Sequence, residues 1–125
     1  MILSTLLAAC AGGLSDSDQL AEAISHFNDD VRWGNYESAS LLMAPAARRA
    51  FLGNLNETTH GGELQSADYE VVGIAPQRNG GALVRVDRAW YLLSDSELHR
   101  GSFVQRWERH DGDWLMVGER ELSPN

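Results

Sequence analysis

The chain has 125 residues, which is enough for one domain, and 43% of them are hydrophobic, as in ordinary globular proteins. Its net charge of −8 at pH 7 argues against a nucleic-acid partner, because phosphate backbones attract basic proteins. The single cysteine excludes an internal disulfide, and none of the four histidines has metal-ligand spacing with a cysteine or carboxylate. We therefore expect no metal and no cofactor.

The amino terminus carries the most informative motif. Residues 1–9 are mostly apolar, and the last three of them form the motif Leu7-Ala8-Ala9-Cys10 with the cysteine that follows. This motif resembles the lipobox of bacterial lipoprotein signal peptides. The resemblance implies that residues 1–9 are a short signal peptide, that Cys10 carries lipid, and that residues 10–15 are the lipidated cysteine and a flexible tether. Two or more acyl chains give stable anchoring. We therefore expect a lipid-anchored protein of the cell envelope, at the outer membrane or the periplasmic face of the inner membrane.

Three helices are predicted in the first half of the domain. Apolar residues recur at helical spacing across residues 16–33, and Asp16 is expected to cap this helix. A second, short helix is expected to follow Asn35, its cap, and to run through Met43. Pro45 should open a third, from Ala46 to about Leu55, because proline is favoured at the start of a helix. Residues 56–63 are polar and contain two glycines, which predicts a loop.

Four antiparallel strands are predicted in the second half, at residues 68–75, 82–93, 98–109 and 113–122, where the apolar period changes to two. Two dipeptides, Asn79-Gly80 and Asp111-Gly112, are typical of tight hairpin turns. Helices followed by such a meander predict an α+β fold, with three N-terminal helices packed on one face of a curved antiparallel sheet of about four strands.

The hairpins also predict a register. Pairing Leu93 with Leu98 places Arg88 opposite Phe103, and the second turn places Phe103 opposite Arg120. The face that the helices should cover then holds Val84, Val86, Trp90, Phe103, Trp107, Trp114 and Met116. The opposite face holds Arg85, Asp87, Arg100, Arg106, Glu108 and Glu119.

This order of elements resembles the nuclear transport factor 2-like superfamily, the cone-shaped, cystatin-like fold of ketosteroid isomerases and polyketide cyclases. The resemblance rests on residues 105–117, a strand, an Asp-Gly turn and a returning strand rich in Trp and apolar residues, and on residues 27–39, where a long helix breaks into a short one. It implies one cone-like domain over residues 16–125. It identifies a shape and not a reaction. Isomerases of this superfamily use an Asp base and a Tyr/Asp oxyanion hole, roles that no residues here match.

One polar group on the apolar face is a candidate site. Arg88, Gln105 and Arg120 surround Phe103 in the predicted register, and a buried guanidinium is costly unless it is paired. Two alternatives stay open. In one, a helix carboxylate pairs with the arginine, the candidates being Glu22, Asp30 and Glu37. In the other, the arginines line an open cone mouth and hold a carboxylate or phosphate. The ligand-binding residues under this hypothesis are Arg88, Gln105, Arg120, Phe103 and Trp90.

Three functions are left open. The first is a non-enzymatic envelope domain that binds a small acidic molecule or another envelope protein. The second is a cone-fold isomerase or cyclase acting on a small hydrophobic substrate, which an enclosed cavity with an Asp or Tyr at its base would indicate. The third is an accessory module that docks through the sheet face, where a homodimer could also form. An exposed Trp33 or Trp90 beside a groove would instead indicate a glycan or peptide partner.

Overall fold

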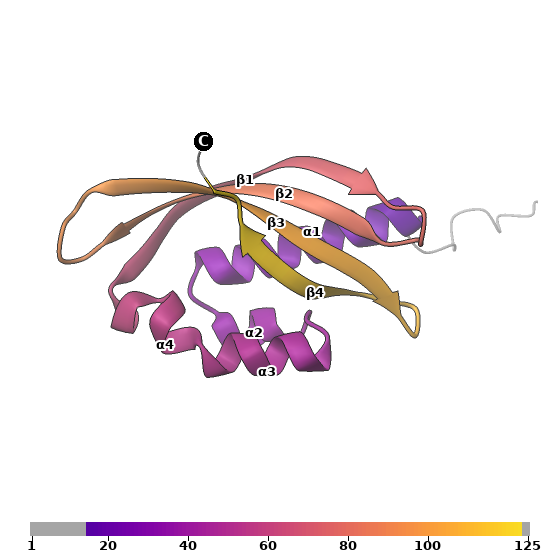
Figure 1. Cartoon of the computed structure of the whole chain (residues 1–125), viewed down its shortest axis with the longest axis horizontal. Coiled ribbons are helices and arrows are strands. Elements are labelled where there is room, and N and C mark those ends of the chain that lie inside the picture. Colours follow the sequence, from indigo (N-terminus) through magenta and orange to yellow (C-terminus); the bar gives the residue numbers. More distant parts are fainter. Residues whose placement is uncertain (1–14, 124–125) are drawn as a thin grey trace, which may run out of the picture.

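A four-stranded antiparallel sheet arches over four helices in the computed structural model, which describes residues 15–123 (Figure 1). The α-helices are α1 (Asp16–Arg32), α2 (Tyr36–Ser40), α3 (Pro45–Gly53) and α4 (Leu55–Thr58), followed by the 3-10 turn η2 (His60–Gly62). The strands are β1 (Leu64–Pro76), β2 (Ala82–Leu92), β3 (Leu98–His110) and β4 (Asp113–Glu121). The predicted signal peptide, the tether up to residue 14 and Cys10 lie outside the described residues.

Helix α1 forms because its apolar residues fall on one stripe, of which Leu20, Ile24 and Phe27 are buried. Its N-cap is Ser15, whose hydroxyl oxygen accepts the backbone N–H of Asp18 at 3.2 Å. The prediction that Asp16 caps the helix was therefore wrong by one residue. A serine hydroxyl at this position reaches the free N–H groups of the first turn, and Asp16 is already inside the helix.

The predicted third helix divides into two, and the predicted loop after it was wrong. The first part, α3, ends at Gly53, and α4 and η2 occupy residues that look like a loop by composition. The hydroxyls of Thr58 and Thr59 donate to the backbone carbonyls of Asn54 and Leu55, at 3.0 and 2.8 Å. These bonds hold a polar segment in helical turns without an apolar stripe to mark it.

The four strands pair in chain order, β1-β2-β3-β4. Strand β1 begins at Leu64, four residues before the predicted start. The outer edge of β4 is covered by the segment between α2 and α3, since Ala44 N–H donates to the Met116 carbonyl at 2.9 Å and Met116 N–H donates to the Leu42 carbonyl at 2.8 Å. This edge is thus shielded from pairing with another chain.

The register between β2 and β3 differs from the prediction by two residues. Leu98 pairs with Tyr91 instead of Leu93, and Arg88 therefore faces Gly101 instead of Phe103. The connection is wider than predicted, with Ser96 at a φ of 57°. Because side chains alternate with a period of two, a two-residue shift leaves every side chain on its predicted face.

The register between β3 and β4 contains a bulge that does change the faces. Trp107 pairs with Met116, as predicted, but Arg106 pairs with Gly118, so Val117 is an extra residue in β4. Beyond this bulge Gln105 faces Glu119, and Arg120 faces Val104. The prediction that Arg120 lies opposite Phe103 was therefore wrong, and Glu119 takes a place on the face that the helices cover.

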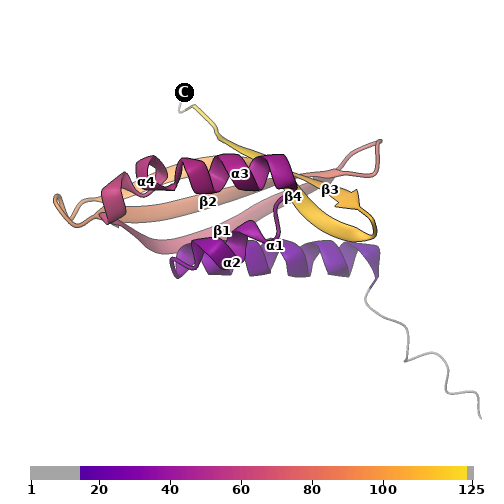
Figure 2. The same cartoon turned by 90° about the horizontal axis from the view of Figure 1, so that it is seen from below.

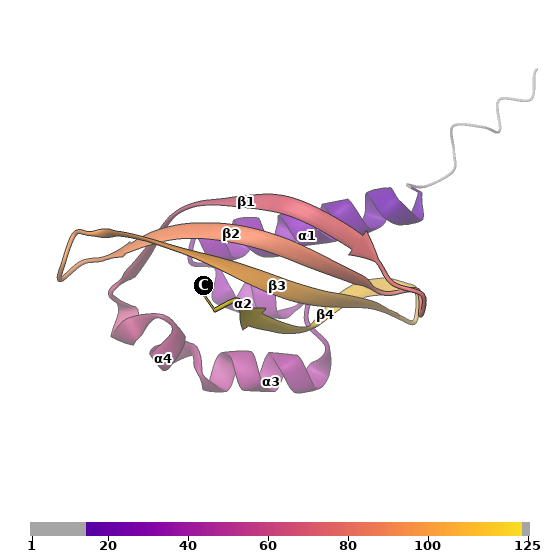
Figure 3. The ribbon, with the colours of Figure 1, turned by 45° about the horizontal axis from the view of Figure 1, so that its top comes forward.

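The core fills the space between the sheet and the helices. Figure 2 shows α1 and α2 along one side of that space and α3 with α4 along the other, and Figure 3 shows α1 crossing beneath β1 and β2. Trp107, Phe27, Ile24 and Met116 are each at most 1% exposed, and Phe27 meets Trp107 edge-on with ring centroids 6.1 Å apart. Among the described residues no helix has the length and apolarity that a membrane crossing requires.

Candidate ligand-binding site

The first polar region, which we name the Arg88 cluster, consists of Arg88, Glu119, Asn28, Gln105 and Trp107. Arg88 forms a two-pronged ion pair with Glu119, its Nη1 and Nη2 donating to the two carboxylate oxygens at 2.7 and 2.8 Å. Its Nη2 also donates to Asn28 Oδ1 at 2.9 Å. Side-chain exposure is only 13% for Arg88 and 23% for Glu119. The positive charge is therefore neutralised inside the protein.

The remaining members close this network. Gln105 Nε2 donates to Asn28 Oδ1 at 3.0 Å and to Glu119 Oε2 at 2.8 Å, while its Oε1 accepts the Trp107 indole N–H at 3.0 Å. Asn28 Nδ2 donates to the Ile24 carbonyl at 2.8 Å. Each member of this buried polar network has a hydrogen-bond partner within it, and such a network contributes to the uniqueness of the core.

The structure brings four of the five predicted site residues together. Arg88 lies over the Phe103 ring at 4.7 Å, the Trp90 and Phe103 centroids are 6.3 Å apart, and Gln105 joins Arg88 through Asn28 and Glu119. Arg120 does not join them, because the bulge places it opposite Val104 on the other face. The pocket with two arginines is therefore not formed.

The carboxylate that pairs with Arg88 is also different from the ones considered in the sequence. It is Glu119 of β4, whereas the helix candidates were Glu22, Asp30 and Glu37. Two signals could have found the cluster. Gly118 inside a strand is typical of a bulge, and Asn28 lies four residues after Ile24 on the buried stripe of α1.

A second region, which we name the Arg32 groove, is lined by residues from the end of α1, from α4 and from the start of β1. Figure 1 shows where these elements lie. The volume of the groove is about 690 Å³. The lining comes from several elements and consists of Arg32, Trp33, Gly34, Tyr36, Leu55, Thr59, Gly62, Leu64, Gln65, Ser66, Ala67 and Tyr91. Among residues 15–123, Arg32 is the one charged residue that contributes to this lining, and none of the contributing residues is acidic.

Arg32 differs from Arg88 in its partners. Its Nη1 donates to the Ser66 backbone carbonyl at 3.1 Å, and its guanidinium lies 4.4 Å from the Trp33 ring centroid. Within residues 15–123 it contacts no carboxylate. Trp33 is 69% exposed and lines the groove. An exposed tryptophan beside a groove is the feature that would indicate a glycan or peptide partner.

Tyr36 is the one residue of α2 among the described residues that line the Arg32 groove. Burial raises the pKa of its phenol, and the positive charge of Arg88 lowers it in part, so the hydroxyl stays protonated at neutral pH. The Tyr36 ring packs against Phe51 with centroids 6.3 Å apart. Tyr36 lines the Arg32 groove, and its hydroxyl makes no hydrogen bond with the described part of the chain.

A tyrosine and an aspartate also pair elsewhere, between α1 and the edge strand β1. The Tyr69 hydroxyl donates to Asp29 Oδ1 at 2.5 Å. Burial, and then the hydrogen bond and negative charge of Asp29, raise the pKa of Tyr69 to about 12. Because the tyrosine proton is held by the aspartate, this pair fixes the helix to the strand.

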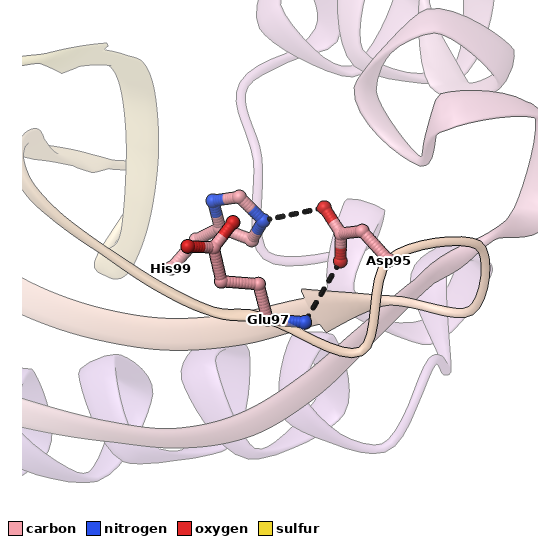
Figure 4. Close-up of side chains that lie close together, drawn as sticks. All are labelled: Asp95, Glu97 and His99. Atoms are coloured by element: carbon pink, nitrogen blue, oxygen red, sulfur yellow. Dashed lines mark hydrogen bonds and ion pairs between the residues drawn. The ribbon is translucent and has the colours of Figure 1, made fainter.

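A third cluster lies at the exposed connection between β2 and β3, where Asp95, Glu97 and His99 point toward one another (Figure 4). Their ligand atoms lie within 4.8 Å of one another, a spacing that a divalent cation could bridge. Both Asp95 oxygens are already used, one by the Glu97 N–H at 2.9 Å and the other by His99 Nε2 at 3.0 Å. These bonds, the backbone one first, hold the pKa of Asp95 below its usual value. Asp95 thus stabilises the turn between β2 and β3 through its bonds to Glu97 and His99.

Comparison with known proteins supports the fold. No protein-family model matches the sequence, and no curated protein matches it significantly. An NTF-2 like protein of unknown function from Shewanella oneidensis MR-1 has a TM-score of 0.67 at 12% identity, over 86% of this chain and 98% of its own. RPA3114, a SEC-C motif containing protein from Rhodopseudomonas palustris, gives 0.65 at 10% identity over 86% and 88%. The Agrobacterium tumefaciens VirB8 protein gives 0.63 at 10% identity over 91% and 99%.

These likenesses confirm the predicted α+β architecture. The described chain has the nuclear transport factor 2-like fold, with four α-helices and a four-stranded antiparallel sheet. At 10–12% identity the likeness is one of fold, and the site must be argued from the residues of this chain.

Proposed function

We propose that this chain is a lipid-anchored, non-enzymatic binding protein of the cell envelope, whose domain holds a small acidic molecule in the Arg32 groove. One observation carries the binding part of the proposal. Arg32 is a half-buried cation without a carboxylate partner among residues 15–123, in a groove whose lining contains no acidic residue. A guanidinium in that setting has donors left for a carboxylate.

The rest of the surface favours the same location. The chain carries a net charge of −8, so an acidic ligand is repelled from most of the molecule. The groove's 690 Å³ lies within the range of roughly 300–1,000 Å³ that small-molecule sites occupy. The Arg88 cluster is a weaker candidate, because its charge is already neutralised by Glu119.

The anchoring part rests on the sequence alone. Leu7-Ala8-Ala9-Cys10 supports lipidation of Cys10, and each buried CH₂ of an acyl chain adds about 0.8 kcal/mol of membrane affinity. We expect the chain to incorporate labelled palmitate and to sediment with membranes when expressed in a bacterium. Cys10→Ser should abolish both. Recovery of the unlabelled wild-type chain in the cytosolic fraction would contradict this part of the proposal.

The binding part is tested by titrating the full-length chain, purified in detergent, with benzoate and citrate by calorimetry. Arg32→Gln should weaken the binding of at least one of them by tenfold or more, because it removes a charged hydrogen bond. Arg49→Gln is the matched control, since Arg49 is an exposed arginine on α3 that lines no part of the groove. Equal binding by all three proteins, or no binding by any, would contradict the proposal.

The isomerase-type alternative has no comparable support. The space between helices and sheet is filled by Phe27, Trp107 and Met116, each at most 1% exposed, where a hydrophobic substrate would have to sit. A homodimer through the uncovered sheet face stays a prediction. That face carries Arg85, Asp87 and Ser102 in a mutual contact, with Ser102 donating to Asp87 at 2.7 Å.

A further inference from the structure

We infer that the acidic molecule held by the Arg32 groove is a carboxylated saccharide, a pyranose chain that bears carboxylate groups. The inference rests on the proposed function and names its ligand class. Three features of the lining point to it: exposed aromatic faces, polar groups without partners, and a single cation beside the most exposed ring.

The aromatic faces come from three different segments. Trp33 follows α1 and is 69% exposed, Tyr91 is the next-to-last residue of β2 and is 38% exposed, and Tyr36, which begins α2, is half-buried. An indole exposed to this extent contributes little to the core and leaves a flat apolar surface in water. The C–H faces of pyranose rings are flat and apolar while their edges are polar, so they stack on such rings without losing the hydration of their hydroxyls.

The polar groups between these rings favour a polyhydroxylated ligand. Tyr36, Gln65, Ser66 and Tyr91 line the groove, and their side-chain polar groups make no hydrogen bond with other described residues. A purely apolar acid would bury them without partners, which costs free energy for each group. Sugar hydroxyls both donate and accept, so they replace the water at these positions.

The positive charge of Arg32 favours a sugar that carries a negative charge. The Arg32 guanidinium lies over the Trp33 ring, 4.4 Å from its centroid, and is the one charged group that residues 15–123 contribute to the lining, so a saccharide that stacks on the uncovered part of this ring has a guanidinium close by. A carboxylate on the sugar ring pairs with that guanidinium in two-pronged fashion, which a neutral hydroxyl cannot do.

The test compares trigalacturonate with its methyl ester, which keeps the sugar and removes the charge. The full-length chain in detergent is titrated with each by calorimetry. We expect trigalacturonate to bind and the ester to bind at least tenfold more weakly. Arg32→Gln should cause the same loss for trigalacturonate and little change for the ester, and Arg49→Gln should change neither.

A second pair of variants tests the stacking. Trp33→Ala should weaken both ligands at least tenfold, while Trp33→Phe, which keeps an aromatic face, should retain most of the affinity for trigalacturonate. Because Trp33 is 69% exposed, both variants should fold like the wild type, which circular dichroism checks.

The outcomes separate the inference from the proposed function. Equal affinity for trigalacturonate and its ester overturns the carboxylated saccharide, and so does tight binding by Trp33→Ala. If benzoate or citrate binds through Arg32 while trigalacturonate does not bind, the saccharide is wrong and the acidic-ligand function stands. If no acid of either kind binds in an Arg32-dependent way, both are wrong.

Discussion

The Arg88 cluster and the Arg32 groove each contain an arginine beside an aromatic ring, and they do opposite things with it. Arg88 lies 4.7 Å from the Phe103 ring centroid and forms an ion pair with Glu119 at 2.7 Å. Arg32 lies 4.4 Å from the Trp33 ring centroid and donates to a backbone carbonyl, and the described residues that line its groove include no carboxylate. Both arginines contact an aromatic ring, so that contact does not distinguish them. The carboxylate partner does: Arg88 has one and is structural, whereas Arg32 is the candidate for binding a ligand.

Acidic residues are abundant in this chain, which has 18 of them against 10 basic residues. An arginine such as Arg32, which pairs with no acidic residue among residues 15–123, is therefore the informative case. In a domain so rich in carboxylates, a half-buried cation in a groove lined without acid is the arrangement that an anionic ligand would need.

The largest expected effect compares one tryptophan from each region. Trp107→Ala should lower the free energy of unfolding by about 4 kcal/mol, because the side chain is fully buried and leaves a cavity. Trp33→Ala should lower it by less than about 1 kcal/mol, since only a contact with Arg32 is lost. Urea denaturation measures both. A loss of several kcal/mol for Trp33→Ala would mean that Trp33 belongs to the core.

A smaller effect is expected from breaking the ion pair. Glu119→Leu should cost about 2 kcal/mol of unfolding free energy, because Arg88 is left without its carboxylate; the partial exposure of Glu119 reduces the penalty below that of a fully buried pair. Adding Arg88→Met should recover most of this loss. Arg32→Gln should cost less than about 1 kcal/mol. If Arg32→Gln proved the more destabilising change in urea, the two roles would have to be exchanged.

The smallest effect concerns pH and lies outside both regions. The pKa of Tyr69 is about 12 in the folded chain and near 10 when unfolded, so folding favours its protonated form. The stabilisation is therefore fully present below pH 10 and is lost as the pH rises from 10 to 12. Tyr69→Phe should flatten the decline in stability over that range, as followed by chemical denaturation at a series of pH values. An unchanged slope would show that the Asp29 hydrogen bond does not hold the proton.

Much of the fold is predictable because the apolar period is regular. The stripe of Leu20, Ile24 and Phe27 predicts α1, and alternation predicts which side of β2 and β3 is buried. The two-residue error in pairing Leu98 did no harm to the predicted faces, because the side-chain period in a strand is also two. The faces of a sheet are thus easier to predict than its pairing.

The site was harder to predict for two physical reasons. A single extra residue, Val117, exchanges the faces of Glu119 and Arg120, and alternation gives no warning of it apart from Gly118. The Arg32 groove gathers residues from α1, α2, α4 and the beginning of β1, which only tertiary packing brings together. The one local signal is the position of Arg32, which continues the α1 stripe four residues after Asn28.

The central claim, that Arg32 and not Arg88 meets the ligand, can be tested directly by nuclear magnetic resonance of the indole N–H groups of the four tryptophans. Assignment follows from Trp33→Phe, Trp90→Phe and Trp114→Phe, which leave the remaining resonance to Trp107. During titration of the full-length chain with trigalacturonate, we predict that the Trp33 resonance shifts progressively while those of Trp90 and Trp107 stay in place. A shift of Trp90 and Trp107 with Trp33 unmoved would contradict the account and return the site to the Arg88 cluster.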